Sequence, residues 1–231
     1  MSVNFKIISL EGNIGAGKST LLQKLKDNYK HENNEIIFVD EPVDIWGTFK
    51  DSITGETMLE KFYKNPTNYA FSFQIMAFTT RVQVLQNAIS KNPHARLFVC
   101  ERSLEADKHI FAKMLHDDGL IDDVMYQVYE RSFQQYLGQM QNLGLDGMIY
   151  INTDPVTCFD RIMKRGRDGE EKIDITYLTR CHDYHTKWLS DINIPVLSTS
   201  SNYNTEKHFA IHKFLQQVLI EPFSKYNVYC E

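Results

Sequence analysis

Cysteine is scarce in this sequence, and no two cysteines stand close together. The four cysteines are Cys100, Cys158, Cys181 and Cys230. This spacing excludes a CxxC metal site and a disulfide-rich scaffold, and it predicts reduced thiols in an intracellular protein. The first residues also lack an apolar leader or an Arg-rich transit segment, and no apolar run is long enough to span a bilayer. We therefore expect a cytoplasmic protein.

The sequence also lacks a surplus of positive charge. It has 25 Lys and Arg residues against 30 Asp and Glu residues, for a net charge of −5. Proteins that bind polynucleotides or anionic membranes need a surplus of Lys and Arg, so neither is an expected partner. Repeats, low-complexity segments and flexible linkers are absent as well. With 231 residues, of which 42% are hydrophobic, the chain is long enough for one domain over residues 1–231 with a small mobile lid.

Short apolar runs alternate with helical patterns along the chain. The runs are rich in Ile, Val, Phe and Leu and cover residues 5–10, 36–39, 96–100, 147–151 and 194–198. Helical patterns start at Lys18 and Leu104 and cover about 68–91, 121–142, 155–165, 174–190 and 205–219. This alternation predicts an α/β fold, in which a five-stranded parallel sheet has helices on both faces. Ligands of such sheets bind outside the carboxyl ends of the strands.

A glycine-rich motif follows the first predicted strand and precedes the first helix. Its residues are Gly12, Asn13, Ile14, Gly15, Ala16, Gly17, Lys18, Ser19 and Thr20. Glycines let successive backbone N–H groups point at phosphate oxygens, Lys18 can reach the β- and γ-phosphates, and the Ser19 hydroxyl can ligate Mg²⁺. The motif predicts a nucleotide-phosphate site, but it does not distinguish a kinase from a GTPase or a motor protein.

Carboxylates stand at the ends of the second and third predicted strands. Glu41 follows the run that ends at Val39, and Glu101 and Arg102 follow the run that ends at Cys100. Near a phosphate site, a carboxylate can accept a proton from an attacking hydroxyl or hold Mg²⁺. The alternative is that these acids are solvated or cap the next helix.

A basic cluster marks a second candidate region. Arg161 and Arg165 share a helix face, and Arg167 lies in the glycine-containing loop that follows. Such arginines can close over a triphosphate and neutralise charge on the transferred phosphoryl group. This pattern predicts an Arg-rich lid over about residues 161–174. A solvated helix end that complements its own dipole is the alternative.

The helix over about 68–91 carries polar residues on a largely apolar face. Gln74, Ala77 and Arg81 are spaced three and four apart. A glutamine side chain offers a donor and an acceptor side by side, which suits the edge of a nucleobase. Asp107 could pair with Arg81 in this task, and Phe111 could stack on the base. A buried structural ion pair between Arg81 and Asp107 explains the same pattern.

Five linked motifs resemble those of the deoxyribonucleoside kinases, in particular the deoxycytidine and deoxyguanosine kinase branch. They read GNIGAGKST, EPVDIW, FSFQ…R, ERSLEAD and RGRDGEE, and the similarity runs from residue 5 to about 190. The resemblance implies a P-loop kinase fold, ATP as the phosphoryl donor, Mg²⁺ as the cofactor and a homodimer. The product would be a deoxyribonucleoside monophosphate made for nucleotide salvage.

The resemblance also implies roles for the charged residues near the phosphate loop. Glu41 would be the general base for the 5′-hydroxyl group, and Arg102 would lie near that hydroxyl. Lys18 would hold the donor phosphates. Glu101 would take part in the Mg²⁺ site together with Ser19. The donor phosphates would also contact the lid residues, which are Arg161, Arg165 and Arg167.

For the acceptor, the resemblance implies that Tyr63 and Glu170 hold the 3′-hydroxyl group. Gln74 would read the base, assisted by Arg81 and Asp107. The walls of the pocket would be formed by Trp46, Leu59, Phe73, Ala77 and Phe111. Because a charged pair at a base edge disfavours a base that leaves it unpaired, we expect thymidine to be a poorer substrate than deoxyguanosine, deoxyadenosine or deoxycytidine.

Two other readings fit part of the pattern. A nucleoside monophosphate kinase would need arginines in its acceptor pocket, and Arg81 and Arg102 keep this alternative open. A P-loop switch protein would need a guanine-reading NKxD motif, which the sequence lacks. The segment from Ser198 to Tyr203 contains no acidic residue of the kind the family carries in its donor-base loop, so the choice between ATP and other donors stays open.

Overall fold

A computed structural model describes residues 5–29, 35–139, 144–220 and 227–229 of the protein. Within them, a parallel sheet has the strand order β2-β3-β1-β4-β5-β6. Its strands are β1 (Lys6–Glu11), β2 (Ile36–Val39), β3 (Leu97–Glu101), β4 (Gly147–Asn152), β5 (Val196–Ser200) and β6 (Asn227–Tyr229). The five predicted strands are confirmed. The sixth, β6, was not predicted because a segment of three residues shows no periodicity.

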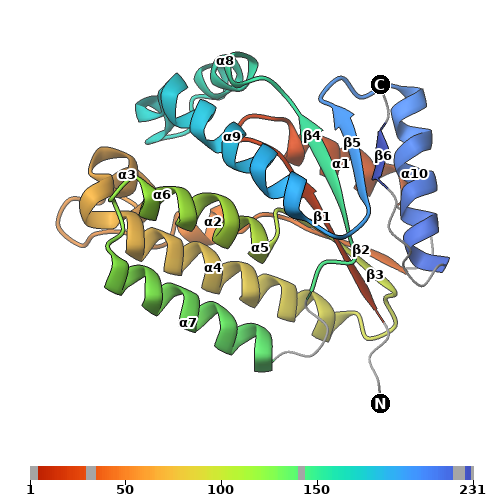
Figure 1. The fold of residues 1–231 in the computed structure, drawn as a ribbon, viewed down its shortest axis with the longest axis horizontal. Coiled ribbons are helices and arrows are strands. Elements are labelled where there is room, and N and C mark those ends of the chain that lie inside the picture. Colours follow the sequence, from red (N-terminus) through yellow and green to blue (C-terminus); the bar gives the residue numbers. More distant parts are fainter. Residues whose placement is uncertain (1–4, 30–34, 140–143, 221–226, 230–231) are drawn as a thin grey trace.

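Helices cover both faces of the sheet, as predicted (Figure 1). They are α1 (Lys18–Asn28), α2 (Val43–Trp46), α3 (Met58–Lys64), α4 (Pro66–Lys91), α5 (Leu104–Ala106), α6 (Lys113–Asp117), α7 (Asp123–Gln139), α8 (Pro155–Arg165), α9 (Ile175–Asp191) and α10 (Thr205–Ile220). The helix predicted from Leu104 is divided, because a π-helix, η1 (Asp107–Ala112), separates α5 from α6. Helical turns of this kind are frequent at functional sites.

Alternate residues of the central strand bury opposite faces of the sheet. Ile8 belongs to a core that includes Leu22 of α1 and Leu215 of α10. Ile7 packs on the other face, in a core that includes Phe78 of α4 and Tyr129 of α7. Figure 1 shows α4 and α7 together on one side of the sheet and α10 on the other. Because both faces are covered, the strands are apolar along their length rather than alternating.

The register of the sheet brings the predicted carboxylates to one edge. Leu10 of β1 pairs with Glu101 of β3, and Val39 of β2 pairs with Cys100. Glu41 follows β2 by two residues. The ends of three neighbouring strands therefore present Glu41, Glu101 and the glycine-rich loop to the same space.

Among the residues that the structure describes, no helix is both long enough and apolar enough to cross a membrane.

Candidate active site

The glycine-rich loop wraps around the side chain of Lys18. Gly15 has a φ of +79°, and a Cβ at this position would lie 2.5 Å from the carbonyl oxygen of Cys158, so only glycine fits. The Lys18 ammonium donates to the carbonyl oxygens of Gly12 at 3.2 Å and Asn13 at 2.9 Å. Burial, followed by the charge of Arg102, lowers the pKa of Lys18 to about 8. The lysine is therefore still charged at neutral pH and held where a phosphate would lie.

A cavity of about 390 Å³ extends from this loop across the strand ends. Every residue predicted for the acceptor pocket lines it, namely Glu41, Trp46, Leu59, Tyr63, Phe73, Gln74, Ala77, Arg81, Arg102, Asp107, Phe111 and Glu170. Its other end is lined by Ile14, Gly15, Gly17, Lys18, Ser19, Thr20, Glu101, Arg161, Arg165 and Arg167. Of the predicted loop residues, Gly12, Asn13 and Ala16 lie outside the lining. The structure thus brings both predicted groups to one cavity.

Glu41 lies between two arginines at the middle of the cavity. Its Oε1 atom is 2.6 Å from Nη2 of Arg81 and 3.3 Å from Nε of Arg102. Burial opposes ionisation of Glu41, but the charges of Arg81, Arg102 and Lys18 outweigh it and lower the pKa of Glu41 to about 2. The carboxylate is therefore ionised at neutral pH and held by two guanidinium groups.

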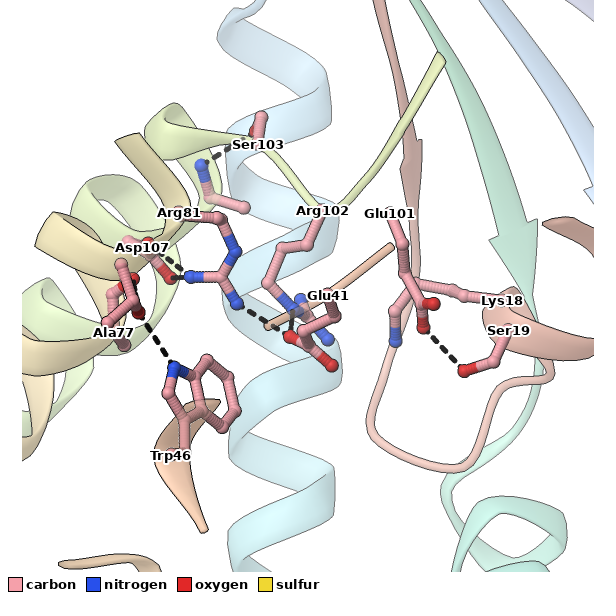
Figure 2. Close-up of polar contacts among 12 residues, drawn as sticks. Lys18, Ser19, Glu41, Trp46, Ala77, Arg81, Glu101, Arg102, Ser103 and Asp107 are labelled. Carbon is pink, nitrogen blue, oxygen red and sulfur yellow. Dashed lines mark hydrogen bonds and ion pairs between the residues drawn. The ribbon is translucent and has the colours of Figure 1, made fainter. Parts of the chain in front are cut away.

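Arg81 lies between Glu41 and Asp107 and contacts both (Figure 2). Its Nη1 atom donates to both carboxylate oxygens of Asp107, and its guanidinium lies over the Trp46 ring at 5.4 Å. Burial works against the charge of Arg81, but Asp107 and Glu41 outweigh it and raise the pKa of Arg81. Gln74 is 1% exposed, and its Oε1 atom has no hydrogen-bond partner within the described residues. A buried acceptor of this kind is expected to bind a donor of a ligand.

Ser19 and Glu101 form a pair of oxygen donors beside the phosphate loop. The Ser19 hydroxyl donates to Oε1 of Glu101 at 2.6 Å, and both side chains line the cavity. Hydroxyl and carboxylate oxygens suit Mg²⁺, which usually takes one or two protein ligands, with water and substrate phosphates completing its shell. The pair therefore fits an Mg²⁺ ion that takes its remaining ligands from water and a bound nucleotide.

Arg102 occupies an unusual backbone conformation at the end of β3. Its φ is 66°, and it is the one non-glycine residue with a positive φ among those that the structure describes. The guanidinium donates from Nη2 to the carbonyl oxygen of Gly12 at 3.3 Å and lies 4.6 Å from the centre of the Phe111 ring. Strained backbones of this kind cluster at active sites.

The predicted lid arginines make two different sets of contacts. Arg161 donates to the carbonyl oxygen of Ala16 at 3.1 Å and to the Ser201 hydroxyl at 3.0 Å. Arg165 and Arg167 instead bind the buried carboxylate of Glu170, at 2.6 Å and 3.2 Å. Arg161 is therefore fixed to the phosphate loop, whereas the other two are bound to a predicted acceptor residue.

The loop after α8 rests on α3. Gly169 has a φ of +85°, and a Cβ built there would lie 3.0 Å from the Cα atom of Glu60. Helix α3 supplies Leu59 and Tyr63 to the acceptor end of the cavity. The segment predicted as a lid is thus in direct contact with α3, which lines the predicted acceptor pocket.

Sequence reasoning missed three residues of this region. Tyr177 of α9 lines the cavity, Thr80 of α4 accepts a hydrogen bond from the Trp46 indole at 2.8 Å, and Glu11 is buried beneath Arg102. Tyr177 and Thr80 carry no distinguishing pattern in the sequence. Glu11 does, since it is an acid in the last position of an apolar strand.

The fold and this cavity define a P-loop nucleotide-binding protein of the α/β class. The deoxynucleoside kinase family matches the sequence over residues 8–221. A probable deoxycytidine kinase of fowlpox virus is 38% identical over 202 residues, which cover 85% of this chain and 79% of the relative. The chain therefore belongs to the deoxynucleoside kinase family and is a nucleoside kinase.

Cellular relatives agree with this assignment. Deoxycytidine kinase 2 of Gallus gallus is 33% identical over 227 residues, covering 87% of this chain and 84% of the relative. The mitochondrial deoxyguanosine kinase of Xenopus laevis is 29% identical over 231 residues, covering 89% and 84%. The predicted resemblance to the deoxycytidine and deoxyguanosine kinase branch is confirmed.

Proposed function

We propose that this kinase transfers the γ-phosphoryl group of ATP, or of another nucleoside triphosphate, to the 5′-hydroxyl group of a deoxyribonucleoside. Deoxyguanosine, deoxyadenosine or deoxycytidine are favoured over thymidine, and the product is the monophosphate. The observation that carries the proposal is the position of Glu41, between Arg81 and Arg102 in a cavity that ends at the phosphate loop. The relatives named for deoxycytidine and deoxyguanosine support the acceptor class.

The phosphate loop and its neighbours would hold the donor. Lys18 and the backbone N–H groups of the loop bind the phosphates, while Ser19 and Glu101 would hold Mg²⁺, directly or through water. The ion would neutralise charge on the donor phosphates. A second cavity of about 240 Å³ begins at Gly17 and Thr20 and reaches Tyr203. We assign the base of the donor to this cavity.

Glu41 would accept the proton of the 5′-hydroxyl group while Arg102 orients that hydroxyl towards the phosphoryl group. At the sugar, Tyr63 and Glu170 would hold the 3′-hydroxyl group. Burial, followed by the charge of Glu170, raises the pKa of Tyr63, so its hydroxyl remains a donor. The transfer depends on positioning and charge stabilisation rather than on covalent chemistry by the protein.

The lid consists of about residues 161–174 and would close over the donor when the donor binds. Arg165 and Arg167 would then exchange Glu170 for phosphate oxygens, which are better-matched partners for a guanidinium. This exchange would free the Glu170 carboxylate for the sugar. We treat residues 1–231 as a single kinase domain that contains this lid.

A coupled phosphorylation assay with ATP and Mg²⁺ tests the proposal. The four common deoxyribonucleosides and their monophosphates are supplied separately, and turnover is measured for each. We expect turnover of deoxyguanosine, deoxyadenosine or deoxycytidine and little of thymidine. Activity on monophosphates alone would overturn the acceptor assignment and favour a nucleoside monophosphate kinase.

We also propose that the protein is a homodimer that uses α7. This helix packs on α4 with one face and exposes large apolar side chains on another: Val124 is 70% exposed, Val128 49% and Met125 43%. Apolar residues at this spacing favour helix pairing with a second copy. Val128→Glu is expected to shift the sedimentation coefficient from dimer to monomer, whereas Val156→Glu on α8, where Val156 is 61% exposed, should leave it unchanged. A monomeric wild-type protein would contradict this proposal.

A cytoplasmic location remains part of the proposal. Cys100, Cys158 and Cys181 are buried free thiols, as is usual for a reducing compartment. Cys230 lies outside the described residues.

A further inference from the structure

We infer that Glu11 is a positioning residue for phosphoryl transfer, which holds Arg102 in place from beneath the cavity. The inference rests on the proposed function, because it concerns the same reaction. Glu11 is the last residue of β1 and directly precedes the phosphate loop. It is fully buried, with an exposed fraction of 0%, and it does not line the cavity. It therefore acts through another residue and not on the substrate.

The two carboxylate oxygens of Glu11 have different surroundings. Oε1 accepts a hydrogen bond from the backbone N–H of Ser103 at 2.8 Å. Oε2 lies 3.9 Å from Nη1 of Arg102. Within the described residues, neither Oε2 nor that Nη1 atom has a hydrogen-bond partner. Oε1 thus holds the backbone of the residue after Arg102 by a hydrogen bond. Oε2 attracts the Arg102 guanidinium electrostatically.

The backbone contact matters because the chain turns sharply at Arg102. The N–H of Arg102 still donates to the carbonyl oxygen of Leu10 at 3.0 Å, as a strand residue would, but its φ of 66° turns the chain out of the sheet. Ser103 then caps the short helix α5 by accepting from the N–H of Ala106 at 3.0 Å. Glu11 anchors this turn from the neighbouring strand, and the turn directs the Arg102 side chain over the end of β1.

The charge contact matters because Arg102 serves two carboxylates. Its Nε atom is 3.3 Å from Glu41, and its Nη1 atom faces Glu11. The negative charge of Glu11 balances part of the positive charge of Arg102, so Arg102 has two counter-ions, Glu11 and Glu41. Without Glu11, the guanidinium would be drawn towards Glu41, and the carboxylate would be a poorer proton acceptor.

Burying a carboxylate that has one unpartnered oxygen carries a desolvation cost, which the hydrogen bond from Ser103 and the charge of Arg102 must offset. The charge of Glu11 is therefore kept at a site where an uncharged side chain could accept the same hydrogen bond. The competing explanation is that Glu11 only satisfies the N–H of Ser103. Glutamine separates the two explanations, because its amide oxygen can keep that hydrogen bond while the charge is lost.

The experiment compares Glu11→Gln with the wild type and with Ser9→Ala, a matched control. Ser9 is also fully buried on β1, two residues away and on the same face, and its hydroxyl has no partner within the described residues. For Glu11→Gln we expect turnover to fall by roughly 10- to 100-fold, the range known for outer-shell partners that orient a functional group. The KM of the nucleoside should change less than about twofold. The melting temperature should fall as well, because buried Arg102 loses one of its two counter-ions. Ser9→Ala should keep wild-type turnover.

Unchanged turnover in Glu11→Gln would overturn the inference. A fall in turnover accompanied by a rise of more than about twofold in the KM of the nucleoside would overturn it too, because it would show a general loss of the site and not a loss of positioning. Both results require a wild-type enzyme that phosphorylates at least one deoxyribonucleoside. A wild type with no such activity would instead refute the proposed function.

Discussion

Replacing Glu41 with glutamine is expected to lower turnover by roughly 10²- to 10⁴-fold, the usual contribution of a general base, and to change the KM of the nucleoside little. The amide has the shape of the carboxylate and can accept hydrogen bonds from Arg81 and Arg102, which hold Glu41 at 2.6 Å and 3.3 Å. It has no negative charge to take up the hydroxyl proton. Single-turnover rates measured with saturating ATP would report this step separately from product release.

Asp40→Asn is a suitable control for the Glu41 variant. Asp40 is the adjacent residue and also carries a carboxylate, but its side chain is 67% exposed and pairs with Lys26 at the surface. We expect its replacement to leave turnover unchanged. If Glu41→Gln retained wild-type turnover, Glu41 would not be the general base. The position of Glu41 between Arg81 and Arg102 would then no longer support the proposed function.

The second large effect concerns the choice of acceptor. We expect the wild type to use thymidine with a kcat/KM at least about 10²-fold below that for its best substrate, because buried charged groups discriminate strongly against a base that leaves them unpaired. Replacing Arg81 with leucine and Asp107 with alanine together should raise the kcat/KM for thymidine relative to deoxycytidine. The pair should be changed together because a single replacement leaves one charge buried without its partner.

Arg81→Leu alone provides the comparison for the double variant. It leaves the Asp107 carboxylate, which is 2% exposed, without its guanidinium, so we expect a lower melting temperature than for the double variant. Steady-state kinetics with the four nucleosides give the specificity, and thermal unfolding gives the stability. Strong thymidine turnover by the wild type would leave the kinase assignment intact and refute this account of its specificity.

The sequence predicts the fold and much of the site because the relevant patterns are local. A phosphate loop is recognised from nine consecutive residues, and apolar runs identify buried parallel strands. The register of a parallel sheet then brings Glu41 and Glu101 together, since Glu101 ends β3 and Glu41 follows β2 by two residues. The spacing of Gln74 and Arg81 also predicts correctly that they share a helix face, because α4 is continuous from Pro66 to Lys91.

What the sequence does not predict depends on contacts between distant segments. The contact of Glu11 with Arg102 joins the ends of β1 and β3, and no local pattern encodes it. The division of the predicted helix after Leu104 has the same origin, since η1 packs between α4 and α9. β6 was not predicted for another reason, because it is a segment of three residues that pairs with β5 at the edge of the sheet.

The contact between Gly169 and α3 has a consequence for how these enzymes could be recombined. Because a Cβ at Gly169 would lie 3.0 Å from the Cα atom of Glu60, the loop after α8 and helix α3 must keep their present separation. A corresponding loop taken from a relative would have to approach α3 just as closely. Two segments that lie about a hundred residues apart in the chain are therefore constrained to change together in any functional chimera.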